Sequence, residues 1–167
     1  MPNEPKQSSI TQESNAINPI ARRNARRYAL QAMYQWQIAG TSIDQIESEF
    51  LHYHIDKKLD LAYFKELVHG VPKHQHEIDH EMQLFLGRPL HEIDPIELAV
   101  LRLATYELIK RPDVPYRVII NEALELTKKF GSIEGHKFVN GVLDRIAKKN
   151  RVTEITMGKE PYKNSSS

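Results

Sequence analysis

The 167-residue sequence contains no cysteine, and this absence excludes disulfides, thiolate metal ligands and cysteine nucleophiles. Its seven glycines stand singly, so none of the glycine-rich phosphate-binding motifs occurs. No hydrophobic run is long enough to cross a bilayer, and the polar N-terminus lacks the apolar core of a secretory signal. We therefore expect a soluble, cytoplasmic protein that makes no membrane contact.

The composition is that of one globular domain with polar ends, because hydrophobic residues make up 40% and charged residues 27% of the chain. Residues 1–20 and 151–167 lack periodic apolar residues and are predicted to be disordered tails. The segment between them, residues 21–150, is long enough to bury a core of its own.

Apolar residues between the tails recur at the 3.6-residue spacing of amphipathic helices, and no strand alternation is present. The clearest helix start is at Asp94, which is predicted to cap, with Pro95 at the first helical position and Glu97 completing a capping box. The pattern predicts an all-α fold of about seven helices joined by short loops. They are expected at 21–39, from 42 onward, and at 56–70, 72–86, 94–111, 115–130 and 135–149.

A histidine pair, His76 and His80, stands in the pattern H-E-x-x-H that is typical of zinc hydrolases. Both histidines fall about 160° around the predicted helix from the core position Ile78, so we expect them to face solvent. The extended motif would need glycine and histidine where Gln83 and Leu86 stand. We reject a metal site here, and no other pattern in the sequence indicates catalysis or a cofactor.

The first predicted helix carries four arginines that share one face. At roughly 100° per residue they cover an arc of about 140°, roughly opposite the core stripe, and Tyr34 falls inside that arc. Arginines bind phosphates and a ring can stack on an unpaired base, so the arc suits single-stranded nucleic acid. A solvated arginine face with a tyrosine covering a neighbour is the alternative. The arginines are Arg22, Arg23, Arg26 and Arg27.

A second group of basic residues lies near the other end of the predicted domain. Basic residues gathered at both ends hint at a polyanion partner, although ordinary solvated helix faces would look the same. The sequence does not say whether this group lies close to the arginine arc. Its members are Lys128, Lys129, Lys137, Lys148 and Lys149.

Four segments resemble the family of the bacterial transcription antitermination factor NusB. They are ARRNARRYALQAMYQWQ at 21–37, ELAVLRLATYEL at 97–108, DVPYRVIINEALELTKKFG at 113–131 and HKFVNGVLDRIAKK at 136–149. The resemblance covers about residues 20–150 and implies two small helical bundles packed together. It also implies a non-catalytic protein that binds boxA, a short single-stranded element of nascent RNA, together with the small-subunit ribosomal protein that acts as NusE. The pair would help RNA polymerase resist termination, notably on ribosomal RNA operons.

By position, the resemblance assigns RNA contacts to the arginine-rich start of the first helix and places Tyr34 at the surface shared by RNA and partner. It places Glu97, with the nearby helix surface, against the ribosomal protein. Phe130 also fits the core stripe of its helix, so a core role and an RNA contact both stay open. With the arc and the lysine pair included, the predicted RNA-binding residues are Arg22, Arg23, Arg26, Arg27, Tyr34, Phe85, Lys128, Lys129, Phe130 and Glu134.

Two further expectations follow from the resemblance. Similar helical domains occur fused to RNA cytosine methyltransferases, so a helical RNA-binding module acting with a separate RNA-modifying enzyme is the alternative function. Free family members can also form homodimers that mask the RNA face. From the arc, we expect the double change Arg22→Ala with Arg26→Ala to weaken RNA binding and leave helicity and melting unchanged.

Overall fold

The computed structural model describes residues 18–54 and 58–159, and these ranges form eight α-helices and one short 3-10 helix, without a strand. The all-α class is therefore confirmed. Within the described ranges, no helix combines the length and apolarity that a membrane crossing requires. The helices are α2 (Pro19–Ala39), α3 (Ile43–His54), α4 (Leu61–Lys73), α5 (Gln75–Leu86), η1 (Leu90–Glu92), α6 (Pro95–Lys110), α7 (Tyr116–Phe130), α8 (Ile133–Asn150) and α9 (Val152–Lys159).

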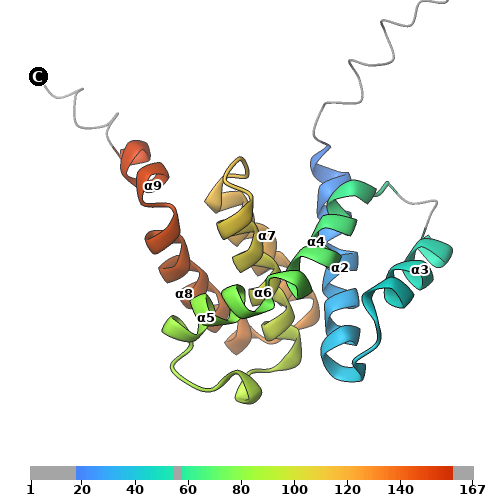
Figure 1. Ribbon diagram of the computed structural model, residues 1–167. Helices are drawn as coiled ribbons and strands as arrows, with labels where there is room; N and C mark the ends of the chain where they lie inside the picture. Colours follow the sequence, from blue (N-terminus) through green and yellow to red (C-terminus); the bar gives the residue numbers. More distant parts are fainter. Residues whose placement is uncertain (1–17, 55–57, 160–167) are drawn as a thin grey trace, which may run out of the picture.

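Helix α6 lies at the centre, and both bundles pack on it. Helices α2, α3 and α4 form one bundle, and α5, α7 and α8 form the other (Figure 1). Every residue of α6 from Ala99 to Leu108 is buried, as expected of a helix enclosed on all sides. The two small packed bundles are therefore confirmed, and α6 is the element they share.

Local capping explains where α2 begins. The side chain of Asn18 accepts hydrogen bonds from the backbone N–H groups of Ile20 and Ala21 at 3.0 and 3.1 Å. Pro19 fills the first helical position, where its missing N–H costs nothing. The helix thus starts two residues before the expected position, with Asn18 as its cap and residues 19 and 20 inside it. The rest of the predicted N-terminal tail, residues 1–17, lies outside the described residues.

The start of α6 confirms the predicted cap at Asp94 and Pro95 at the first helical position, but among the described residues Glu97 makes no side-chain hydrogen bond that would complete the capping box. The carboxylate of Asp94 accepts from the N–H groups of Ile96 and Glu97 at 2.9 and 3.2 Å.

Gly40 and Gly87 end α2 and α5 in the left-handed region, with φ of +64° and +71°. Glycine adopts that conformation without the steric cost that a Cβ brings.

Pro72 does not begin a helix as the sequence suggested. Helix α4 continues through it to Lys73, and α5 starts at Gln75. A proline in the last turn removes only one hydrogen bond of its own helix, so α4 tolerates it there. The predicted helix at 56–70 in turn begins later, at Leu61, where the Asp60 side chain accepts from the N–H of Tyr63 at 3.1 Å.

The prediction of a disordered tail from residue 151 was wrong for residues 151–159. Arg151 is only 6% exposed, and its guanidinium donates to four backbone carbonyls at the end of α6 and in the turn before α7. Helix α9 follows directly. A charged residue such as arginine is normally predicted to be exposed, so the periodicity of apolar residues gives no sign that Arg151 is buried. Residues 160–167 lie outside the described part of the chain.

Candidate nucleic-acid interface

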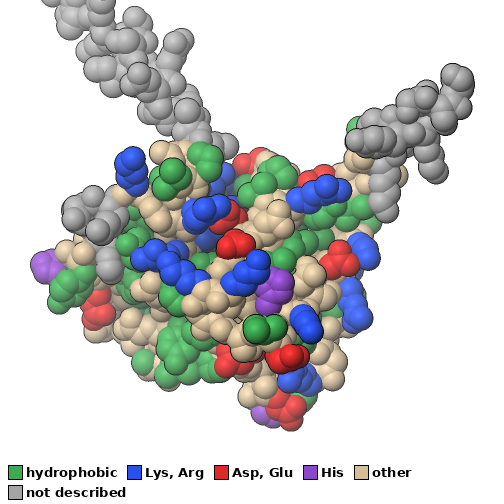
Figure 2. Space-filling model, turned by 180° about the vertical axis from the view of Figure 1, so that it is seen from behind, with side chains coloured by type: hydrophobic (Ala, Val, Ile, Leu, Met, Phe, Trp, Pro, Cys, Tyr) green, Lys and Arg blue, Asp and Glu red, His purple; other side chains and the backbone are tan. Residues whose placement is uncertain are grey.

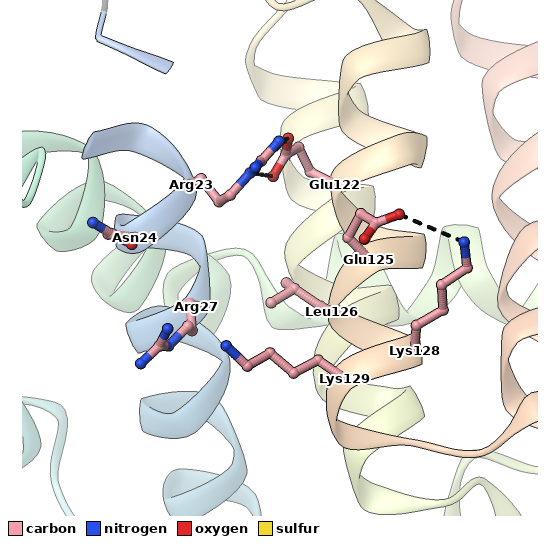
Figure 3. A pocket seen from close by; sticks show the side chains of 8 residues that line it. All are labelled: Arg23, Asn24, Arg27, Glu122, Glu125, Leu126, Lys128 and Lys129. Atoms are coloured by element: carbon pink, nitrogen blue, oxygen red, sulfur yellow. Dashed lines mark hydrogen bonds and ion pairs between the residues drawn. The ribbon is translucent and has the colours of Figure 1, made fainter. Parts of the chain in front are cut away.

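A groove of about 360 Å³ lies between α2 and α7, which both pack against α6. Its basic residues come from two segments far apart in the sequence: Arg23 and Arg27 from α2, Lys128 and Lys129 from α7 (Figure 3). Leu126 lines the groove between them. The second basic group, whose position the sequence left open, therefore adjoins the arginine arc through these two lysines.

Two of the four basic side chains in the groove are paired with carboxylates. The Arg23 guanidinium donates to both oxygens of Glu122 at 3.0 to 3.3 Å. The ammonium of Lys128 lies 3.5 Å from Glu125. Within the described ranges, neither Arg27 nor Lys129 has an ion-pair partner.

Arg26 does not lie on this surface, and its predicted solvent-facing position was wrong. It is 5% exposed, and its guanidinium donates to both oxygens of Glu107 at 2.8 Å each. The Tyr63 hydroxyl also donates to Glu107. Burial lowers the pKa of Arg26, but the hydrogen bonds and charge of Glu107 outweigh this and hold the pKa above its ordinary value. A charged Arg26 therefore joins α2 to α6 inside the protein.

Arg22 is likewise turned toward the protein. Its side chain is 13% exposed, with Nε 3.6 Å from Asp60 and the guanidinium 4.1 Å from the ring centre of Tyr63. The helical wheel misled here because α2 packs against α4 as well as α6. The buried face of α2 consequently spans about 200° of the helical wheel, and the positions of both Arg26 and Arg22 fall within it. Only Arg23 and Arg27 of the arc reach the groove.

Two aromatic side chains on these helices are exposed. Tyr34 is 40% exposed and lies two turns beyond Arg27 on the same face of α2. Phe130, at the end of α7, is 37% exposed, and the Lys129 ammonium lies 5.7 Å from its ring centre. The core role left open for Phe130 is therefore wrong. An RNA contact for either ring stays a prediction.

Phe85 lies elsewhere, in a second groove of about 380 Å³ between α5 and α8. Phe138 and Arg145 also line this groove, and the guanidinium of Arg88 stands 4.5 Å from the ring centre of Phe138. Phe138 and the two arginines were not among the predicted RNA-binding residues. In the sequence, the signal that could have indicated this groove is an aromatic residue, Phe138, at the edge of a core stripe with an arginine nearby on the same helix.

Glu97 and Glu134 are the acidic residues that the resemblance singled out. Glu134 is exposed in the first turn of α8. Glu97 is half-buried against α8, where a Cβ on Gly135 would lie 2.9 Å from its Oε1. Burial raises the pKa of Glu97, and the neighbouring charge of Asp94 adds to the effect.

Charges of both signs share the surface of the molecule. Figure 2 shows one face, on which Lys and Arg side chains gather with Asp and Glu side chains among them. A polyanion that binds such a surface must compete with carboxylates of the protein for its cations. This mixture distinguishes the molecule from a uniformly basic one.

The histidine pair on α5 points to solvent as predicted. His76 and His80 are exposed, whereas Ile78 between them is fully buried. A separate group between α3 and α4, formed by Glu47, His69 and Asp44, brings possible ligand atoms within 4.8 Å of one another. The imidazole of His69 and the ammonium of Lys65 already contact Glu47.

Comparison with known proteins gives one consistent result. The profile of the NusB family matches residues 23–148. The transcription antitermination protein NusB of Idiomarina loihiensis is 55% identical over 129 residues, 77% of this chain and 93% of that protein. The solved structure of T. maritima NusB matches with a TM-score of 0.69 and 34% identity, covering 77% of this chain and 92% of that one. A structure of the antitermination factors NusB and NusE in complex with dsRNA matches with a TM-score of 0.68 and 30% identity, covering 78% and 98%.

Proposed function

This chain belongs to the NusB family of transcription antitermination proteins, and from that premise we propose that it binds boxA-type RNA together with the ribosomal protein that acts as NusE. It is a non-catalytic factor. In this proposal the pair joins the antitermination complex of RNA polymerase and supports processive transcription of ribosomal RNA operons.

The observation that carries the proposal is that four basic residues, two from α2 and two from α7, line one groove. Such a groove can follow the phosphates of a strand, and the exposed rings of Tyr34 and Phe130 offer stacking surfaces for unpaired bases. Glu134, exposed at the start of α8, would accept a hydrogen bond from a base amino group rather than bind phosphate.

The partner part of the proposal rests on Glu97 and Tyr34. A related structure contains NusB, NusE and RNA together, which supports a surface built from two proteins. A bipartite surface raises the number of contacts that one RNA strand can make, so binding should improve when the partner is present. We propose that the half-buried Glu97 and the exposed Tyr34 face the ribosomal protein.

Binding to short RNAs tests the proposal. A boxA-like strand, a scrambled strand and a duplex would be titrated over a range of salt, with and without the purified ribosomal protein. About four phosphate contacts imply a log–log salt slope of roughly −3 for single-stranded RNA. We expect preference for the boxA-like strand, sharpened by the partner. Equal weak binding to all three RNAs without a partner effect would contradict the proposal and favour a module serving an RNA-modifying enzyme.

A further inference from the structure

The wall of the α2–α7 groove on the α7 side carries two carboxylates one turn apart, Glu122 and Glu125. Glu122 is largely covered, with a side chain 16% exposed, and binds the Arg23 guanidinium through both oxygens. Glu125 and Lys128 are each more than half exposed. An exposed pair of this kind contributes little, so Glu122 is the carboxylate that holds a cation of the groove firmly.

At the other end of the groove, neither Arg27 nor Lys129 has a carboxylate partner among the residues that the structure describes. Figure 3 shows Lys129 extending from α7 toward α2, where Arg27 lies one turn beyond Arg23. The Nε of Arg27 is buried, and no described residue hydrogen-bonds to it. Arg27 and Lys129 can therefore bind an anion directly, whereas Arg23 must first release the Glu122 carboxylate.

Resting on the function proposed above, we infer that Glu122 competes with RNA phosphate for Arg23 and thereby sets the affinity of the groove. A first phosphate enters between Arg27 and Lys129. A second phosphate then replaces the Glu122 carboxylate on Arg23, because phosphate oxygens match the guanidinium fork as a carboxylate does. Arg23 and Arg27 lie about 6 Å apart along the axis of α2, which suits consecutive phosphates of one strand.

The test is the substitution Glu122→Gln in the full chain, assayed with the boxA-like RNA and the ribosomal protein. We expect affinity to rise about fivefold, and the salt slope to steepen by about 0.7, the value of one further phosphate contact. In an Arg23→Gln background the same substitution should have no effect, because the cation for which Glu122 competes is gone.

The matched control is Glu125→Gln, which removes the same charge from the same groove one turn away. It reports the general gain from adding net positive charge, and we expect less than about a twofold change. Arg27→Gln combined with Lys129→Gln should lower affinity about tenfold and flatten the slope by about 1.4, the value of two contacts. Thermal melting should be unchanged in all these variants, since none of the five replaced side chains is in the core.

Two results would overturn the inference while leaving the proposed function intact. One is normal RNA preference in the wild-type protein with identical gains for Glu122→Gln and Glu125→Gln. The other is a gain from Glu122→Gln that persists when Arg23 is replaced. Failure of the wild-type protein to prefer the boxA-like RNA would overturn the proposed function and this inference together.

Discussion

At the scale of single residues, Arg26 contributes to stability rather than to the surface. Its guanidinium and the Glu107 carboxylate form a buried bidentate pair, which the Tyr63 hydroxyl completes by donating to the same carboxylate. Both charges are hydrogen-bonded, so their burial between α2, α4 and α6 is compensated. Losing one partner would leave the other charge in the core without compensation.

We therefore predict that Arg26→Ala lowers the free energy of unfolding by about 3–5 kcal/mol, the range for breaking a buried ion pair. Urea unfolding followed by circular dichroism measures this. Arg23→Ala is the control, because its side chain is 64% exposed, and it should cost less than about 1 kcal/mol. Wild-type melting of Arg26→Ala would contradict the structure. For the same reason we now expect the double change Arg22→Ala with Arg26→Ala to lower the melting temperature, and not to leave it unchanged.

Glu97 gives a pH-dependent prediction. Burial raises its pKa in the folded state, so the folded protein binds a proton at Glu97 more readily than the unfolded chain does. Stability from this group is therefore greatest at low pH and declines as pH rises from the unfolded pKa, about 4.3, through the raised folded value. We predict that Glu97→Gln raises Tm at pH 7 and that the gain disappears below about pH 4. A lower Tm at pH 7 would contradict this cause.

At the scale of elements, Gly70 of α4 leaves room for a side chain of the neighbouring helix α6. A Cβ on Gly70 of α4 would lie 2.6 Å from the Tyr106 ring of α6, whereas a Cβ on Gly141 of α8 meets nothing within 4 Å. We predict opposite effects from one chemical change. Gly70→Ala should destabilise by about 1–3 kcal/mol through overpacking. Gly141→Ala, exposed inside a helix, should stabilise by about 0.5–1 kcal/mol.

Denaturant midpoints of the two glycine variants provide the measurement. A neutral Gly70→Ala would mean that the Tyr106 ring moves aside at no cost. Because Gly141 also lines the α5–α8 groove, only stability is compared. Helical content should stay at the wild-type value in both variants.

Elements set by local chemistry were predictable from the sequence, and those set by distant partners were not. Asp94 with Pro95 marks a helix start within four residues of sequence, so α6 begins where expected. The predicted solvent-facing position of Arg26 was wrong because its partner Glu107 lies on another helix. A helical wheel describes one helix and does not include the surfaces on which that helix packs. Periodicity likewise could not place Lys129 beside α2, because that neighbourhood exists only after both helices pack on α6.

At the scale of the whole molecule, both bundles pack on α6, and the C-terminal segment binds the C-terminal end of this helix through Arg151. The Arg151 guanidinium donates to the carbonyls of Leu108 and Val114 at 2.9 Å each and to the Glu154 carboxylate at 2.7 Å. Two further carbonyls, of Glu107 and Arg111, accept from it at 3.2 and 2.8 Å. The carbonyls of Glu107 and Arg111 also accept from the backbone N–H groups of Arg111 and Val114. The Leu108 carbonyl faces Pro112, which has no N–H to donate, so the Arg151 guanidinium supplies a donor that the end of α6 lacks.

We predict that Arg151→Ala lowers the free energy of unfolding by about 3 kcal/mol, since several charge-assisted hydrogen bonds to buried carbonyls are lost at once. Arg145→Ala, an exposed arginine on the preceding helix, is the control and should stay within about 0.5 kcal/mol of wild type. Ending the chain after residue 150 should cost at least as much as Arg151→Ala, because it removes the same guanidinium. If both changes cost no more than the control, residues 151–159 would behave as the tail that the sequence suggested, and the end of α6 would need another support.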